Sequence, residues 1–360
     1  MMELEIKIKT PTVVTSGDKL YRADIFQKDG TYYRVRAEDL IYSMVKDVGN
    51  IEKLNEILQK YKEELFKPTN TQSLFKNIKI DDKLILPRID DYPKSDRIRE
   101  IFDYTGYFRE INNRYYFLPY IPGSTIKGLL RTALIHHIWK NFKNDGNIKN
   151  AENKINFYNP KTQSKQLTDI FRFIHVSDFH VEVDDYSNIS LSIGEVLRIN
   201  RTGVSSGIRS YTFYYPQNMK FSGEIKIQKD LEIYLKNLKK ESFYYSRFKE
   251  NAVLDEMIIK NFVNDKLNSK AIIIFLLNKL KEYTKDVVKS DQYSFLFQKY
   301  DVKISDDNNI YDAYIGRFKG KYLNIPVLPN NIRTFPIINA KNEMRKMGHI
   351  TLEIKGEDPK

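Results

Sequence analysis

Apolar and polar residues alternate along several short stretches of the chain, which is the spacing of a β-strand with one buried face. This pattern predicts strands at residues 4–9, 32–35, 83–86, 171–183, 195–200, 220–227 and 349–355. Residues 107–120 alternate on both sides of Asn112-Asn113 and predict a hairpin that turns there. Helical spacing covers residues 37–66 and most of 230–288, whereas the polar residues 144–165 predict a loop. The mixture predicts an α+β protein.

The most informative stretch is IPGSTIKGLLRTAL, residues 121–134. Pro122-Gly123 predicts a turn, and Ser124 is a good N-cap for a helix that follows. Lys127 and Arg131 are four residues apart, so they project together from one face of this helix. Free N–H groups, the positive end of the helix dipole and two cations would favour a phosphate or an RNA backbone. The alternative is an ordinary amphipathic helix with solvated basic residues.

Composition limits the class of protein. With 360 residues and 41% hydrophobic residues, the chain is long enough for two domains. No apolar run approaches the ~20 residues that span a membrane, and residues 1–14 lack the order of a signal peptide. The absence of cysteine excludes disulfides, thiolate metal sites and cysteine nucleophiles. We therefore expect a soluble, cytoplasmic protein.

The net charge of +12 indicates a polyanionic partner. The chain also contains 25 Tyr and 21 Phe, and aromatic rings beside Lys and Arg suit single-stranded RNA. An AT-rich genome would impose much of the same composition, so this signal is weak by itself.

Residues 121–134 resemble the IPGSSLKGALR-type motif of the RAMP superfamily, the RRM-like proteins of CRISPR systems. The matching positions are Pro122, Gly123, Ser124, Lys127, Gly128 and Arg131. The resemblance implies two ferredoxin-like (RRM-like) βαββαβ domains, at 1–185 and 186–360, with a helical insertion at about 230–288 in the second. It also implies RNA contacts from Gly123, Ser124, Lys127 and Arg131.

Residues 196–215 are a second candidate RNA-binding stretch. They place three arginines around two glycines, ahead of a run of Tyr and Phe: Arg198, Arg201, Arg209, Gly203 and Gly207. Glycine lets the backbone approach a phosphate closely, and arginine supplies paired donors. The alternative is a hairpin with solvated charges. The resemblance favours RNA binding, because subunits of these complexes insert such a hairpin across the guide RNA.

GRFKG, residues 316–320, is similar to the glycine-rich loop that RAMP proteins carry near their C-terminus, although only Gly316 and Gly320 remain. The resemblance implies that Arg317 and Lys319 are further RNA contacts. The nearby Arg345 and Lys346 are expected to be solvated. Near the other end, Ser16-Gly17-Asp18 predicts a turn after the first strand.

The histidines are the remaining candidates for chemistry. His175 and His180 are five residues apart on a predicted strand, so they should face opposite sides. His136 and His137 fall late in the motif helix, and His349 opens the last strand. No pair has metal-ligand spacing, and the paired aspartates are typical of loop tips. Asp178 lies in a segment that resembles the RVSDS segment of this family and implies a structural residue. We expect no metal and no cofactor.

Both ends of the chain, residues 10–41 and 333–355, resemble the fifth Csm subunits of type III-A CRISPR effector complexes. This implies a non-catalytic subunit that binds the 3′ portion of the crRNA, the guide RNA. It would cap one end of the stack of RAMP backbone subunits and support crRNA maturation and antiviral defence. The implied partners are crRNA, other Csm RAMP subunits and host nucleases that trim the crRNA, with no membrane.

Two alternatives stay open at this point. The first is a RAMP endoribonuclease that cuts CRISPR repeat RNA, with His136 or His137 as the acid–base. The second is a basic RNA-binding module outside CRISPR systems.

Overall fold

The computed structural model of the chain describes residues 1–21, 24–28, 30–35, 55–56, 59, 84–85, 87–92, 100–141, 154–158, 167–200, 203–240, 245–246, 249, 251–289, 303–307, 309–316, 335–340 and 343–356. Most of the predicted helix at 37–66 and of the predicted loop at 144–165 lies outside these ranges. Of the predicted strand at 83–86, the structure describes β5 (Leu84–Ile85).

The first sheet has the order β19-β22-β1-β16-β13-β9-β5. Its strands are β1 (Met2–Ile8), β9 (Arg114–Ile121), β13 (Phe179–Glu182), β16 (Lys220–Ile227), β19 (Ile310–Tyr314) and β22 (His349–Ile354), with β8 (Gly106–Ile111) paired to β9 and β12 (Ile174–Val176) paired to β16. In the stretch β22-β1-β16-β13, all neighbours are antiparallel.

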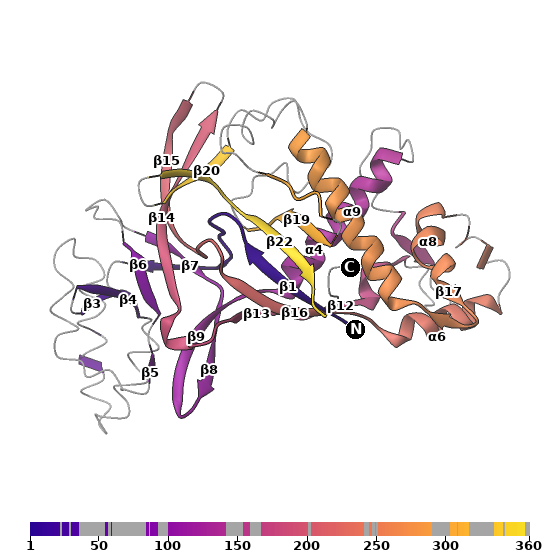
Figure 1. The fold of residues 1–360 in the computed structure, drawn as a ribbon, viewed down its shortest axis with the longest axis horizontal. Helices are drawn as coiled ribbons and strands as arrows, with labels where there is room; N and C mark the ends of the chain where they lie inside the picture. The colour runs from indigo at the N-terminus through magenta and orange to yellow at the C-terminus, as the bar shows by residue number, and fades with distance from the viewer. Residues whose placement is uncertain are drawn as a thin grey trace.

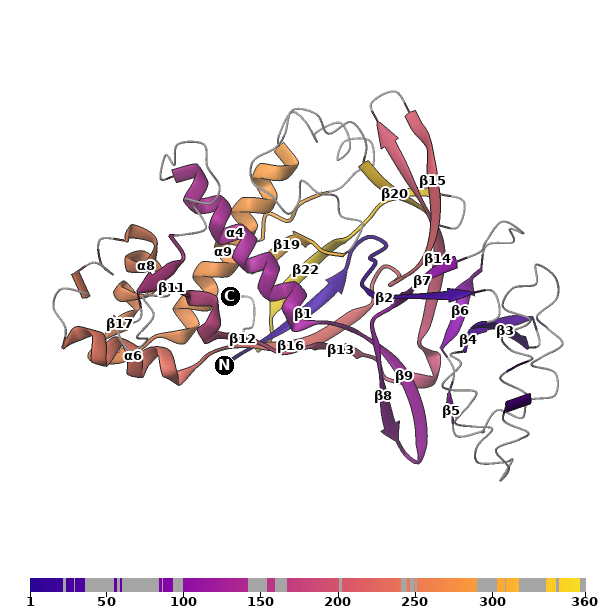
Figure 2. The same cartoon turned by 180° about the vertical axis from the view of Figure 1, so that it is seen from behind.

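Two helices and four strands of this sheet form a βαββαβ unit. The helix α4 (Gly123–Asn141) lies between β1 and β13 in the chain, and α9 (Ser269–Lys289) lies between β16 and β22. The unit therefore runs β1, α4, β13, β16, α9, β22, which is the ferredoxin-like order. Figures 1 and 2 show the two helices side by side against the sheet.

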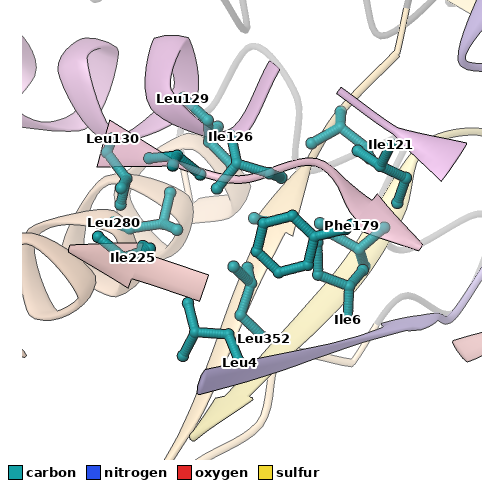
Figure 3. Close-up of a cluster of buried hydrophobic side chains, with 14 of the residues drawn as sticks. Leu4, Ile6, Ile121, Ile126, Leu129, Leu130, Phe179, Ile225, Leu280 and Leu352 are labelled. Atoms are coloured by element: carbon teal, nitrogen blue, oxygen red, sulfur yellow. The ribbon is translucent and has the colours of Figure 1, made fainter. Parts of the chain in front are cut away.

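The core lies between this sheet and its two helices. On β1, Met2, Leu4, Ile6 and Ile8 are buried, while the residues between them are partly or fully exposed. Figure 3 shows Leu4 and Ile6 with residues of α4, α9 and the neighbouring strands: Ile126, Leu129, Leu130, Leu280, Phe179, Ile225 and Leu352. Each such side chain contributes about 1.5–3 kcal/mol through burial. The buried face of α4 packs here, so the opposite face of this helix points outward.

The second sheet has the order β2-β7-β15-β14-β6-β4-β3. Its strands are β2 (Thr15–Tyr21), β3 (Ile25–Lys28), β4 (Thr31–Arg34), β6 (Arg88–Asp91), β7 (Glu100–Tyr104), β14 (Ser190–Asn200) and β15 (Gly203–Tyr214), and β20 (Phe335–Ala340) joins β21 (Glu343–Lys346) to β14. Arg34 Nε donates to Asp103 Oδ1 at 2.8 Å, and neither side chain is exposed. This ion pair ties β4 to β7 across the sheet.

The α+β prediction is confirmed, whereas the two predicted ferredoxin-like domains are not confirmed. One βαββαβ unit runs from β1 to β22, and a second is not visible in the ranges given above. Each sheet takes strands from both sides of residue 185, so strand pairing does not follow the predicted division into 1–185 and 186–360.

The predicted helical segment at 230–288 contains α6 (Lys229–Lys239), α8 (Ala252–Met257) and α9, with the short hairpin β17 (Phe262–Val263) and β18 (Lys266–Leu267) between them. Because α9 is the second helix of the βαββαβ unit, it covers the sheet rather than belonging to an insertion. Among the helices of the described residues, none has the length and apolar character needed to cross a bilayer.

Candidate nucleic-acid interface

The motif helix α4 begins at Gly123, one residue before Ser124, the predicted N-cap. The N–H of Gly123 donates to Asp178 Oδ1 at 2.8 Å, and the N–H of Thr125 donates to the carbonyl of Pro122 at 2.9 Å. The N-cap prediction for Ser124 is therefore wrong. A carboxylate of the protein already lies at the positive end of the helix, where the sequence predicted a site for an external anion.

Gly123 packs tightly against the connection between β12 and β13. A Cβ at this position would lie 2.2 Å from the carbonyl oxygen of Val176 and 2.5 Å from that of Ser177. Glycine is therefore needed here for the close approach of two backbones, and Gly123 itself is buried.

Lys127 and Arg131, the two cations of the motif, differ in their surroundings. Arg131 Nε lies 3.0 Å from Asp169 Oδ2, and the same carboxylate accepts the N–H of Phe171 at the start of the short helix η2 (Ile170–Phe173). Lys127 is half-buried and forms no ion pair with any residue that the structure describes. Lys127 is thus available to bind a ligand. Arg131 instead stabilises the neighbouring start of η2 through Asp169.

An open groove of about 770 Å³ lies beside α4. One wall is formed by residues of the helix: Ser124, Thr125, Gly128, Leu129 and Thr132. The other wall is the start of β2 and the end of the β19 region: Val14, Thr15, Ser16, Gly17 and Gly316. Among these lining residues there is no charged side chain. The groove therefore offers hydroxyl groups and bare backbone.

Gly128 keeps the helix wall of this groove open. A Cβ at Gly128 would have no neighbouring atom within 4 Å, so no packing contact requires glycine at this position. Glycine inside a helix costs about 1 kcal/mol relative to alanine. The bare backbone at Gly128 leaves room for a ligand.

The motif indicated one wall of the groove, whereas no pattern in the sequence indicated the other. Ser16 and Gly17 were interpreted as part of a turn, Ser16-Gly17-Asp18, after the first strand. In the structure Thr15, Ser16 and Gly17 begin β2, and Gly17 has a φ of 97°. The signal was present as a run of two hydroxyl residues and a glycine, but only the fold brings it beside α4.

The predicted hairpin at 196–215 is confirmed as β14 and β15, with a register shift between Val196 and Arg198. Figure 1 shows it extending away from the body, at the opposite end from the β8–β9 hairpin. Arg198 and Arg209 lie on these strands, but their side chains are outside the described part. Arg201 is outside it altogether, as are Arg317 and Lys319. Gly316, the residue before Arg317, lines the groove.

His136 and His137 lie where α4 packs on α9. His136 Nε2 is 3.0 Å from Asp286 Oδ2, and His137 Nδ1 is 3.6 Å from Glu282 Oε2. Both histidine side chains are only 12% exposed. Burial and the nearby Lys279 lower the pKa of His137. The two side chains thus contribute to helix packing.

His175 and His180 face the same side of the first sheet, so the prediction that they face opposite sides is wrong. His175 pairs with Lys226 and His180 pairs with Ser222, two residues on one face of β16. An extra residue between β12 and β13 shifts the alternation. The ring of His180 lies 4.7 Å from that of Tyr107 and 6.3 Å from that of Tyr120. Nowhere in the described ranges do three or more His, Asp or Glu gather as metal ligands.

Lys346 was expected to be solvated, and this prediction is wrong. Lys346 is 7% exposed, and its Nζ lies 4.9 Å from the centre of the Tyr314 ring. That ring stacks on His349, whose Nε2 lies 2.7 Å from Asp312 Oδ1. Burial lowers the pKa of Lys346 to about 7.

Comparisons with known proteins agree with the motif. A family model of the RAMP superfamily matches residues 5–348. Among solved structures, the chain is similar to one from the cryo-EM structure of a Csm-crRNA-target RNA ternary complex of a type III-A CRISPR-Cas system. The two share 17% identity with a TM-score of 0.60, over 98% of this chain and 100% of that chain.

A second similar structure is the crystal structure of Csm5 from T. onnurineus. It has 15% identity and a TM-score of 0.49, over 96% of this chain and 99% of that chain. No curated protein matches the chain. The structural neighbours are thus subunits of Csm complexes, and at these identities the likeness concerns the fold. Since the family model covers nearly the whole sequence, the chain belongs to the RAMP superfamily.

Proposed function

We propose that this chain is a non-catalytic, crRNA-binding subunit of a type III-A CRISPR (Csm) effector complex. The observation that carries the proposal is the groove beside α4, which is open and whose described lining consists of hydroxyl residues, glycines, Val14 and Leu129, with no acidic side chain among them. A net charge of +12 supports a polyanionic partner. The likeness in fold to a chain of a Csm-crRNA-target RNA complex supports the choice of RNA.

Within this proposal, the motif residues divide into two groups. Ser124 lines the groove and Lys127 lies next to it on the helix, so these two contact RNA. Gly123 and Arg131 act indirectly, because Gly123 is packed against a neighbouring backbone and Arg131 is paired with Asp169. Further contacts come from Arg198, Arg201 and Arg209 of the hairpin region and from Arg317 and Lys319 after Gly316.

The proposal places this subunit at the end of the backbone stack that holds the 3′ portion of the crRNA. An end subunit needs one protein interface that does not propagate, because a repeating heterologous contact would build a filament. There it supports crRNA maturation and antiviral defence, with other Csm RAMP subunits and host nucleases as partners. Photoreactive uridines near the 3′ end of crRNA should crosslink to this chain in the assembled complex, and those near the 5′ end should not.

The competing function is a RAMP endoribonuclease with His136 or His137 as the acid–base. Both side chains lie in the α4–α9 contact next to carboxylates and are mostly buried. A general acid–base must come within hydrogen-bond reach of the substrate. The buried position of both histidines between α4 and α9 opposes such an approach.

The test is to incubate the purified chain with repeat-containing RNA at several pH values, with Mg²⁺, Mn²⁺ or a chelator. We expect binding that weakens steeply with salt, without cleavage. Specific cleavage that disappears in His136→Ala or His137→Ala would contradict the proposal and identify an endoribonuclease.

A second measurement addresses the β14–β15 hairpin. If this hairpin lies over RNA, bound crRNA should slow the hydrogen exchange of its backbone amides relative to the free protein. Unchanged exchange, with binding intact, would remove Arg198, Arg201 and Arg209 from the interface.

A further inference from the structure

The hydroxyl groups of the groove differ in whether the protein already uses them. Thr15 Oγ1 accepts the N–H of Gly17 at 3.0 Å, and Ser16 Oγ accepts the N–H of Asp18 at 3.2 Å. Thr132 Oγ1 donates to the carbonyl of Gly128 at 2.8 Å. The hydroxyls of Ser124 and Thr125 make no hydrogen bond to any residue in the described ranges. These two, on adjacent positions of α4, are available to a ligand.

Among the described residues that line the groove, the polar side chains are hydroxyl groups and none is charged, which indicates the part of RNA that fits between them. A phosphate carries a full charge, and placing it away from cations sacrifices most of its favourable interactions. Lys127 follows Ser124 by three residues, so the two are neighbours on the helix surface and the cation lies beside the groove. Phosphates therefore fit toward Lys127, and a neutral polar group fits between the hydroxyls.

The neutral polar group that RNA has and DNA lacks is the ribose 2′-hydroxyl, which both donates and accepts a hydrogen bond. Gly128 and Gly17 add no side chain that would keep a sugar away, since a Cβ at either would have no atom within 4 Å. We infer that the groove beside α4 reads the 2′-hydroxyl of single-stranded RNA through Ser124 and Thr125, and so selects RNA over DNA. This inference rests on the RNA binding proposed above.

The test measures the affinity of the purified full chain for four single-stranded oligonucleotides with the same bases: RNA, DNA with deoxyuridine, 2′-O-methyl RNA and 2′-fluoro RNA. The 2′-fluoro sugar keeps the pucker of ribose but cannot donate a hydrogen bond. We expect RNA to bind about fivefold to tenfold more tightly than the other three, the effect of one to two hydrogen bonds.

The variants separate the hydroxyl contacts from the phosphate contact. Ser124→Ala with Thr125→Val should lower the affinity for RNA to that for DNA and leave the affinity for DNA unchanged. Lys127→Ala should lower the affinity for RNA and the affinity for DNA by the same factor. Thr31→Val, the same chemical change on β4 and outside the groove lining, should have no effect on either.

The outcomes distinguish this inference from the function on which it rests. If the wild type binds RNA and DNA equally, or if 2′-fluoro RNA binds as tightly as RNA, the reading of the 2′-hydroxyl is overturned while RNA binding stands. The reading of the 2′-hydroxyl is also overturned if the double variant loses affinity for RNA and for DNA to the same extent. If the wild type binds none of the four, the proposed function itself fails, and the inference fails with it.

Discussion

The carboxylate of Asp178 accepts a hydrogen bond from the backbone N–H of Gly123 at 2.8 Å. This contact joins the connection between β12 and β13 to the first residue of α4. It sets the position of the helix against the sheet, and with it the position of Ser124 and Thr125 in the groove. Asp178 was expected to be a structural residue, and this contact gives the expectation a physical basis.

Asp178→Ala should lower the free energy of unfolding by about 1 kcal/mol, the usual effect of losing an acceptor at a helix start. Urea denaturation measures this. Asp184→Ala is the matched control, because it removes an exposed aspartate close by that has no hydrogen-bond partner among the described residues, and it should change little. Equal effects of the two substitutions would show that the hydrogen bond to Gly123 contributes nothing.

Gly128→Ala should change stability and binding in opposite directions. The added methyl group meets no atom of the protein, and alanine is the better helix former by about 1 kcal/mol, so the free energy of unfolding should rise. The same methyl group enters the groove, so RNA affinity should fall several-fold. Asn278→Ala on α9 is the matched control, because it also raises helix propensity at an exposed site. It should not change the affinity for RNA. Unchanged RNA affinity in Gly128→Ala would place the RNA elsewhere.

Lys127→Ala and Arg131→Ala should have different effects, although the sequence presents these residues as a pair. Losing Lys127 should flatten the slope of log K against log salt by about 0.7, the value for one phosphate contact to a single strand. Losing Arg131 should leave the slope unchanged and lower the free energy of unfolding by roughly 0.5 kcal/mol, because its ion pair with Asp169 is partly exposed. A flatter slope in Arg131→Ala would show that Arg131 leaves Asp169 to bind RNA.

Lys346 should make stability depend on pH above neutrality. Burial holds its pKa at about 7 in the folded protein, whereas the unfolded chain keeps the proton up to the ordinary lysine value. Between these values unfolding takes up a proton, so the free energy of unfolding rises with pH, by at most about 1.4 kcal/mol per unit. Urea denaturation at pH 7, 8 and 9 should show this rise in the wild type.

Lys346→Met should flatten this pH dependence, because the buried position then carries no titrating group. Lys226→Met, at an exposed lysine on β16, should keep the wild-type dependence. If Lys346→Met and the wild type have the same dependence, Lys346 is charged in the folded protein at neutral pH.

Local patterns predicted local structure well. The hairpin at Asn112-Asn113 is present as β8 and β9, and both asparagines have positive φ values of 53° and 59°, as a tight turn requires. The strands at 4–9, 220–227 and 349–355 are present as β1, β16 and β22. In β1 the signal is the burial of one face, which alternation records, whereas the first four residues of β22 are all buried.

Features that depend on distant parts of the chain could not be predicted. The alternation through residues 171–183 concealed the extra residue between β12 and β13, so His175 and His180 were assigned to opposite faces. Arg131 was interpreted as a free cation because its partner, Asp169, is brought to it only by the fold. For the same reason the motif revealed the helix wall of the groove, while Thr15 and Ser16 gave no sign that they would lie beside it.

The position of β1 between β16 and β22 determines when the protein can fold during synthesis. β1 is synthesised well before both of its neighbours, which are β16 at residues 220–227 and β22 at residues 349–354. Such distant pairings form slowly, because long loops must close before the contacts stabilise them. Until then the apolar side of β1 is uncovered on the nascent chain. The sheet can therefore close around β1 only after β22 has been synthesised, and a chaperone that binds exposed apolar segments would protect β1 until then.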